Sequence, residues 1–165
     1  MAIYVAVIGP SAAGPAVCDA AFEVGALVAR AGAILVCGGG GGAMEAACRG
    51  AKSAGGLTLG ILPGRSRSEA NPFVDIPVVT GMGEARNALV VRTADVVIAV
   101  GGGFGTLSEI GLALKMERPV VGLSTWEPAL PAGEGEAPIV RARTPQEAVA
   151  LALAARSSSG PVVPT

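Results

Sequence analysis

The stretch Val96–Glu109, which reads VVIAVGGGFGTLSE, says more about the fold than any other part of this chain. Its first five residues are all apolar, as is typical of a strand buried on both faces of a sheet. Four glycines follow within the next five residues, and Thr106 then begins a helical pattern. At such a junction, unpaired backbone N–H groups meet the positive end of the helix dipole, which favours a phosphate group. The stretch therefore predicts a phosphate-binding turn with one carboxylate, that of Glu109, beside it.

Outward from this stretch, short apolar runs alternate with amphipathic segments. We expect strands over residues 3–8, 33–37, 57–62, 76–79, 96–100, 120–123 and 139–141, and helices over 16–31, 43–54, 82–93, 107–117 and 145–156. This alternation predicts an α/β fold, namely a Rossmann-like, doubly wound, mostly parallel sheet of six or seven strands in three layers. Such sheets bind ligands beyond the carboxyl ends of their strands, near the point where the strand order reverses.

Length and composition narrow the classes of function. The 165 residues suit one domain, which we place at residues 1–156, and we expect the Ser/Pro-rich tail 157–165 to be disordered. Hydrophobic residues make up 51% of the chain and charged residues 15%, so part of the surface is expected to be buried against another copy. A net charge of −1 and 3% aromatic residues argue against a nucleic-acid partner.

Residue types that are missing exclude further chemistry. The chain has no histidine and no C-x-x-C pair, so we expect neither a histidine-based catalytic triad nor a bound metal. Cys18, Cys37 and Cys48 lie in apolar segments and are expected to be buried, reduced thiols. No apolar run reaches the ~18 residues of a membrane span and no basic leader precedes the first strand, so we expect a cytoplasmic protein without membrane contact.

Two further glycine-rich loops are expected at the same edge of the sheet. In Gly9–Gly14, Ser11 has two interpretations: it donates to a phosphate oxygen, or it caps the following helix. The run Gly38–Gly42 allows close approach of a ligand or a neighbouring helix. A dinucleotide site would need an acid after the third strand, where residues 62–65 read LPGR, so no NAD(P) dehydrogenase is expected. The residues expected to contact the ligand are Gly9, Ser11, Gly39, Gly40, Gly41, Gly102, Gly103, Gly105 and Thr106.

Arg86 and Glu109 are the candidate catalytic residues. Arg86 lies in the first turn of the helix at 82–93, where the dipole disfavours a cation by about 0.3–1 kcal/mol, so an anionic ligand or a carboxylate partner is expected nearby. The candidate partners are Glu45, Glu84 and Glu109. Glu109 has a second interpretation, because residues 106–109 fit a capping box, T-x-x-E. Like charges about 4 Å apart repel by about 4 kcal/mol at an effective dielectric constant of 20, so beside a bound phosphate the Glu109 carboxylate would face the ribose.

Residues Gly102–Glu109, together with Arg86, resemble the motifs of the Lonely Guy superfamily, whose members are often labelled "possible lysine decarboxylase". The family pattern is P-G-G-x-G-T-x-x-E with an upstream M-x-x-R-K, and the likeness runs from the first strand to about Leu123. Gly101 replaces the proline of the pattern and Asn87 replaces its lysine, which resembles a side branch that includes molybdenum-cofactor carrier proteins. The resemblance implies a Rossmann-like fold and a dimer.

The resemblance implies one of two functions. A carrier-like protein would bind a phosphate-bearing nucleotide or pterin, such as a nucleoside monophosphate or a molybdopterin-type ligand, without turning it over. A phosphoribohydrolase would cleave a nucleoside 5′-monophosphate to free base and ribose 5-phosphate, with Arg86 and Glu109 as the catalytic pair. Neither function requires a further cofactor. A decarboxylase is not expected, because amino-acid decarboxylation uses a Schiff-base lysine and Lys52 and Lys115 lie on helices away from the glycine loops.

The helix at 107–117 is apolar on almost every side, which is typical of a helix buried on more than one face. We expect it to pack, with the helix at 82–93, in a homodimer, and such dimers can pair into a tetramer. A purely structural oligomer with an empty cleft is a third alternative.

Overall fold

Seven parallel strands form one sheet in the order β4-β3-β2-β1-β5-β6-β7 in the computed structural model, which describes residues 1–158. The strands are β1 (Tyr4–Ile8), β2 (Ile34–Cys37), β3 (Thr58–Leu62), β4 (Ile76–Val79), β5 (Val96–Val100), β6 (Val120–Leu123) and β7 (Ile139–Ala142). The helices are α1 (Pro15–Arg30), α2 (Ala43–Ser53), α3 (Asn87–Thr93), α4 (Phe104–Lys115) and α5 (Pro145–Ser158), with 3₁₀ turns η1 (Arg67–Glu69) and η2 (Gly83–Arg86). The predicted doubly wound α/β fold is confirmed, and all six strand pairings are parallel.

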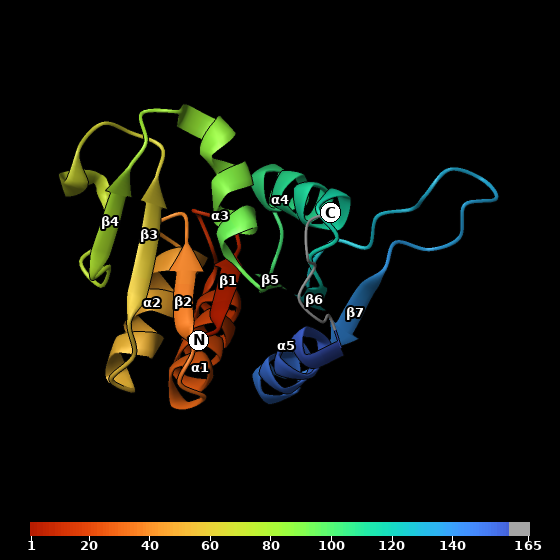
Figure 1. Cartoon of the computed structure of the whole chain (residues 1–165), viewed down its shortest axis with the longest axis horizontal. Helices are drawn as coiled ribbons and strands as arrows, with labels where there is room; N and C mark the ends of the chain where they lie inside the picture. The colour runs from red at the N-terminus through yellow and green to blue at the C-terminus, as the bar shows by residue number, and fades with distance from the viewer. Residues whose placement is uncertain (159–165) are drawn as a thin grey trace.

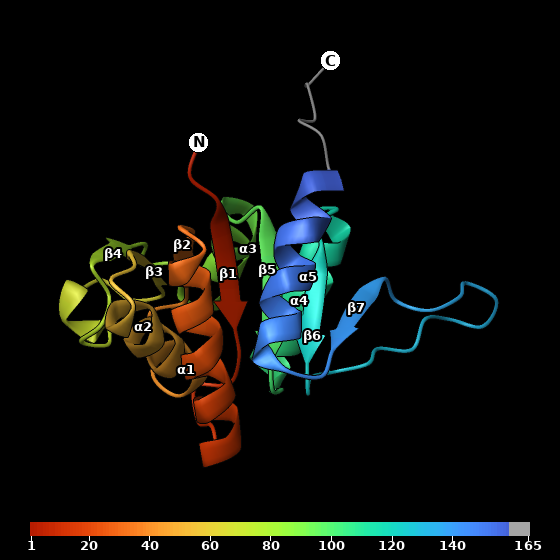
Figure 2. The ribbon, with the colours of Figure 1, turned by 90° about the horizontal axis from the view of Figure 1, so that it is seen from below.

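Helices cover both faces of the sheet and give three layers (Figures 1 and 2). α1, α2 and α5 lie on one face, and α3 and α4 lie on the other. Side chains alternate between the two faces along each strand. Val5 and Val7 of β1 therefore pack in the core beneath α1 and α2, whereas Ala6 and Ile8 pack in the core beneath α3 and α4. β1 and β5 lie in the middle of the sheet and are almost wholly buried, and they position the loops that follow them.

α1 and α2 approach each other closely because each presents a glycine to the other. A Cβ added to Gly25 would overlap the backbone carbonyl of Ala47, and one added to Gly50 would overlap that of Phe22. Backbone atoms in packed helices cannot give way as the end of a flexible side chain can. These two glycines are therefore required by helix packing rather than by a ligand.

Most predicted boundaries lie within one residue of the observed ones, but three helices differ by more. The helix expected at 82–93 divides into η2 and α3, with Arg86 at the junction. α4 begins at Phe104, earlier than the predicted start at residue 107, because the glycine loop before it turns sooner. α5 continues to Ser158, past the expected domain end at residue 156. The rest of the tail expected to be disordered, 159–165, lies outside the described residues.

Residues 124–138, which we name the arm, connect β6 to β7 and project from the body of the molecule (Figures 1 and 2). An isolated antiparallel bridge between Ala129 and Glu136 joins its two limbs. Most residues of the arm are exposed. Within residues 1–158, no helix is both long enough and apolar enough to cross a membrane. Cys37 and Cys48 are buried as expected, while Cys18 is half-buried, and all three are free thiols.

Candidate ligand-binding site

A cleft of about 610 Å³ opens at the carboxyl ends of β1 and β5. The strand order reverses between these two strands, because β2 continues the sheet beyond β1 and β6 continues it beyond β5. Open α/β sheets bind ligands at this position. Eight of the predicted site residues, drawn from three distant parts of the sequence, line the cleft: Gly9, Ser11, Arg86, Gly102, Gly103, Gly105, Thr106 and Glu109. Their contacts with a ligand stay a prediction.

The loop Gly101–Gly105 presents bare backbone to the cleft. Gly101 has a φ of +68°, a left-handed conformation that proline, with φ fixed near about −65°, cannot adopt. The glycine that replaces the proline of the Lonely Guy pattern is therefore required by the path of this loop. A Cβ on Gly105 would meet nothing within 4 Å, and one on Gly103 would meet only Pro10, at 3.7 Å. The fold itself does not require glycine at these two positions, which leaves space for a ligand.

Thr106 and Glu109 lie inside α4 and do not cap it. Gly103 is the N-cap residue of this helix, and within the described chain no side chain accepts a capping hydrogen bond there. The capping-box interpretation is therefore wrong, because the helix starts too early for Thr106 to stand at its cap. The Thr106 hydroxyl is buried and has no hydrogen-bond partner among residues 1–158. Such an unpaired buried group costs about 1–3 kcal/mol, so an acceptor in the cleft would be favourable.

Glu109 is a buried acid that lines the cleft and is only 7% exposed. Burial raises its pKa from 4.5 to about 7, and the positive charge of Arg86 opposes this rise only in part. Burial lowers the pKa of Arg86, while the neighbouring Glu109 and Cys37 raise it. In the described part of the chain, no ion pair joins Arg86 to a carboxylate. Glu109 can therefore exchange a proton near neutral pH, as a general acid or base must.

Arg86 is held at the junction of η2 and α3, where it is the N-cap residue of α3. Its guanidinium lies over the bare backbone of Gly38, and a Cβ on that glycine would overlap it. The Arg86 Nε is buried without a hydrogen-bond partner among the described residues. None of the expected carboxylates therefore forms an ion pair with Arg86 in the described part of the chain. The other predicted partner, an anionic ligand, remains.

The loop Gly38–Gly42 is occupied by the protein's own groups. The side-chain amide of Asn71 donates to the carbonyl oxygens of Gly39 and Gly40, at 3.3 and 2.9 Å. A Cβ on Gly41 would lie 3.5 Å from the carbonyl oxygen of Ser11. Gly39, Gly40 and Gly41 are not among the residues that line the cleft, so the geometry does not favour the ligand contacts predicted for them.

Ser11 lines the cleft but does not cap α1. The N-cap residue of α1 is Gly14, because Pro15 takes the first helical position with its fixed φ. The helix-cap interpretation of Ser11 is therefore wrong. Ser11 is exposed, so its hydroxyl group is free to donate to a phosphate oxygen, as the other interpretation requires.

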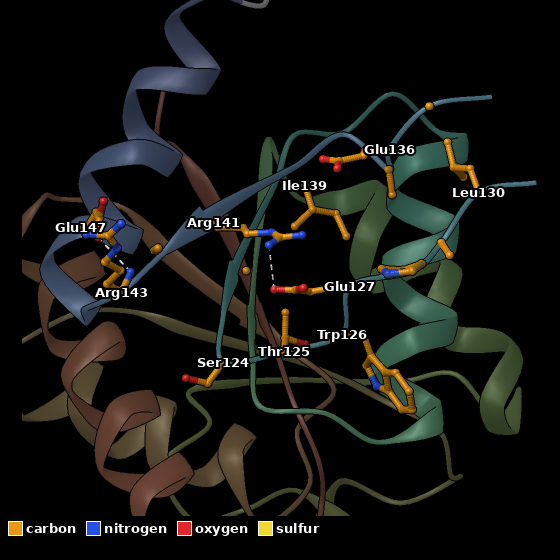
Figure 3. Close-up of a pocket in the computed structure, with 16 residues that line it drawn as sticks. Ser124, Thr125, Trp126, Glu127, Leu130, Glu136, Ile139, Arg141, Arg143 and Glu147 are labelled. Atoms are coloured by element: carbon orange, nitrogen blue, oxygen red, sulfur yellow. Dashed lines mark hydrogen bonds and ion pairs between the residues drawn. The ribbon is translucent and has the colours of Figure 1, made fainter. Parts of the chain in front are cut away.

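A larger cavity, of about 850 Å³, lies between the arm and β7 (Figure 3). An ion pair between Arg141 Nη1 and Glu127 Oε1, 3.1 Å long, crosses it. Two arginines and three glutamates line this cavity, so its charges largely balance one another: Arg141, Arg143, Glu127, Glu136 and Glu147. The larger cavity holds one buried, unpaired hydroxyl, that of Thr125. The smaller cleft is the better candidate site, because two such donors, one of them a cation, lie there beside bare glycines.

The sequence did not predict the roles that two residues, Gly38 and Trp126, have at the site. Gly38 supports Arg86, and only a contact with another segment reveals this role. Trp126 donates from Nε1 to the carbonyl oxygen of Gly103, at 3.0 Å, and its ring stacks on that of Phe104 with centroids 5.9 Å apart. A signal for Trp126 did exist, since the only tryptophan of the chain lies just after a strand that ends at this sheet edge.

The fold and the cleft together define a Rossmann-like protein of the Lonely Guy type, with a glycine loop where the strand order reverses. More narrowly, the family model of the SLOG cluster4 family matches residues 2–149, and the chain belongs to that family.

Solved structures and relatives agree with this membership. The molybdenum cofactor binding protein from the phototrophic bacterium Rippkaea orientalis is 36% identical, with a TM-score of 0.84 over 94% of this chain and 98% of that one. The molybdenum cofactor carrier protein from Chlamydomonas reinhardtii is 37% identical, with a TM-score of 0.84 over 96% and 100%. The cytokinin riboside 5′-monophosphate phosphoribohydrolase of Mycobacterium tuberculosis is 33% identical over 117 residues, which span 66% of this chain and 63% of that enzyme.

Proposed function

We propose that this protein binds a small molecule that carries one phosphate monoester and a flat heterocycle, a nucleotide or a pterin cofactor, and holds it in the cleft without turnover. The observation that carries the proposal is a pair of buried, unpaired donors beside bare backbone: Arg86 Nε and Thr106 Oγ1. The N-terminus of α4 adds backbone N–H groups and a favourable dipole. Arg86 is the one cation that lines the cleft among the described residues, which suits a single phosphate.

The likeness to proteins that bind or carry the molybdenum cofactor supports a pterin-type cargo. A phosphate group fits the residues present, because both orphaned donors need an acceptor. Arg86, Thr106 and the backbone after Gly101 would hold the phosphate, and Glu109 would accept a hydrogen bond from a hydroxyl group. Among residues 1–158, no group of three His, Cys, Asp or Glu residues could hold a metal ion.

Phosphoribohydrolase activity is a second candidate, and one observation favours it: the Glu109 carboxyl has a pKa of about 7. In this reaction the N-glycosidic bond breaks and its electron pair leaves with the base, which takes up a proton. Water adds at C1′ and loses a proton, which gives ribose 5-phosphate. An ionised Glu109 would stabilise the positive charge that develops at C1′. The similarity to the mycobacterial enzyme supports this alternative for part of the chain.

Incubation with a panel of nucleoside 5′-monophosphates separates the two functions, with released base and thermal stability as readouts. The binding function predicts a rise in the melting temperature with at least one nucleotide and no free base. It also predicts that Arg86→Ala abolishes the shift. Release of base that Glu109→Ala abolishes would establish the hydrolase instead. A panel that neither stabilises the protein nor yields base would contradict both functions.

We further propose that the protein forms a homodimer, with pairing of dimers into a tetramer, through the outer faces of α3 and α4. Four half-buried apolar side chains support this proposal: Leu107, Leu112 and Leu114 on α4, and Met116 directly after it. The last three also contact the core beneath the helix, so only part of their surface is free for a second copy. Light scattering at micromolar concentration is expected to give twice or four times the mass of one chain. A single-chain mass would contradict it.

A further inference from the structure

Phe104 and Trp126 form an exposed aromatic pair beside the cleft. Phe104 is 84% exposed and Trp126 is 36% exposed, and their rings stack with an angle of 29° between planes. The chain has five aromatic residues, and the other three, Tyr4, Phe22 and Phe73, pack against the two apolar cores. Large aromatic surfaces are normally covered, because their removal from water is favourable. An exposed, stacked pair at a binding cleft therefore points to a partner that covers it.

Trp126 is fixed to the glycine loop by two kinds of contact. Its Nε1 donates to the carbonyl oxygen of Gly103 at 3.0 Å. A Cβ on Gly102 would lie 2.9 Å from the same nitrogen, so the indole rests on bare backbone there. Figure 3 shows Trp126 beside the first turn of α4, where the arm begins. The indole is thus held in place and can support the ring of Phe104.

Phe104 stands where a ring on the ligand can reach it. It lines the same cleft as Arg86 and Thr106, the two residues proposed to hold the phosphate. Pro10 and Met44 line this cleft as well and add apolar surface suited to a flat ring. The cleft thus has a polar part for an anion and an apolar part for a heterocycle.

We propose that the ring of the bound ligand stacks on Phe104, with Trp126 supporting it from behind, so that this pair selects phosphomonoesters that carry a purine or pterin. The inference rests on the proposed function, since it assigns the ring-binding part of the same cleft. Stacking of a base on an aromatic side chain strengthens binding by about 10- to 100-fold. The aromatic pair, rather than the glycine loop, would then distinguish a nucleotide from a sugar phosphate.

The test compares GMP with ribose 5-phosphate, which lacks the ring, in the wild type, Phe104→Ala and Phe104→Leu. GMP suits both ring classes, because guanine and pterin share the 2-amino-4-oxopyrimidine ring. Calorimetry is expected to give GMP binding about 10- to 100-fold weaker in Phe104→Ala, with ribose 5-phosphate changed less than about twofold. Phe104→Leu keeps apolar cover without an aromatic face and is expected to recover only part of the loss. In the wild type, GMP is expected to quench the emission of the single tryptophan, Trp126, while ribose 5-phosphate leaves it unchanged.

Other outcomes overturn the inference in distinguishable ways. If GMP binds the wild type and Phe104→Ala equally well, the ring does not stack there. If GMP and ribose 5-phosphate both bind more weakly to a variant that remains folded, Phe104 shapes the phosphate loop and does not select a ring. A smaller assembly mass for Phe104→Ala, with GMP affinity unchanged, would assign Phe104 to a contact between copies. If neither ligand binds the wild type, the proposed function itself fails.

Discussion

The two loops Gly38–Gly42 and Gly101–Gly105 look alike in sequence but differ in what they contact. Both follow a buried strand at the same edge of the sheet; the first ends where α2 begins, and the second runs into the first turn of α4. In the first, the protein's own groups fill the space that the glycines leave, including Arg86 over Gly38. In the second, Val17 and Trp126 fill the space beside Gly101 and Gly102, but Gly103 and Gly105 are open. Glycine runs therefore serve either internal packing or an open binding surface, and contacts from elsewhere in the chain decide which.

The largest effect is expected for Gly42→Ala in the first loop. Gly42 has a φ of +61°, and a Cβ there would overlap the backbone carbonyls of Pro10 and Ser11. The strained conformation costs about 1–3 kcal/mol and the overlap adds a similar amount, so a loss of about 3–4 kcal/mol is expected. Urea denaturation measures it. A loss below about 1 kcal/mol would mean that this loop is not tightly packed.

Glu109→Gln is expected to have the next largest effect, and its sign depends on pH. The pKa of Glu109 is raised from 4.5 to about 7 in the folded protein, so the folded state holds its proton more tightly than the unfolded state. The protonated Glu109 carboxyl group stabilises the folded state fully below pH 4.5, and this stabilisation is lost as the pH rises to about 7. The loss is of order 3 kcal/mol.

The Glu109→Gln variant has no ionisable carboxyl group at this position, so it does not lose stability in this way as the pH rises. Its stability relative to the wild type should therefore rise by up to about 3 kcal/mol between pH 4.5 and pH 8, as measured by urea denaturation at both pH values. Glu84→Gln, which removes an exposed carboxylate from the same cleft, serves as the matched control. An identical pH profile for Glu109→Gln and the wild type would contradict the burial of this carboxylate.

Gly38→Ala is expected to affect binding more than folding. The added Cβ displaces the end of a flexible side chain, the Arg86 guanidinium, so the cost in stability should stay near about 1 kcal/mol. Affinity for a phosphate ligand should fall by about tenfold, because the cation moves from its place beside the cleft. Calorimetry with ribose 5-phosphate checks this outcome. Unchanged affinity would mean that Gly38 does not position Arg86 for binding.

The smallest change in stability is expected for Gly105→Ala, and it should be a gain. Gly105 lies within α4 with nothing near its Cβ position, so alanine should stabilise the helix by up to about 1 kcal/mol. The same methyl group would occupy the proposed phosphate site and weaken binding of ribose 5-phosphate. Gly111→Ala is the matched control on the same helix, also in open space but outside the cleft residues. If both variants bind equally well, the second loop is not the phosphate site.

The sequence predicted the fold because its strongest signals are local. Apolar runs such as Val96–Val100 alternate with amphipathic segments, and this alternation leaves few possible arrangements. Arg86 and Glu109 were singled out by the helix dipole, the glycine loop and the family motif; both line the cleft, and their roles stay a prediction.

The parts that the sequence did not predict depend on contacts between distant segments. Whether Gly39 faces a ligand or its own protein depends on Asn71, more than thirty residues away. The capping-box prediction failed because the cap position depends on where Gly103 ends the preceding turn. Trp126 joins the site only because the arm begins beside the same loop. The spacing of residue types along the chain carries no information about such contacts between distant segments.

A crystal structure with bound AMP would test the central claim most directly. The account predicts the phosphate against the backbone of Gly102–Gly105, within hydrogen-bond distance of Thr106 Oγ1 and the Arg86 guanidinium. A phosphate bound instead beside Arg141 and Arg143 in the cavity under the arm, or a cleft filled by the protein's own side chains, would contradict it.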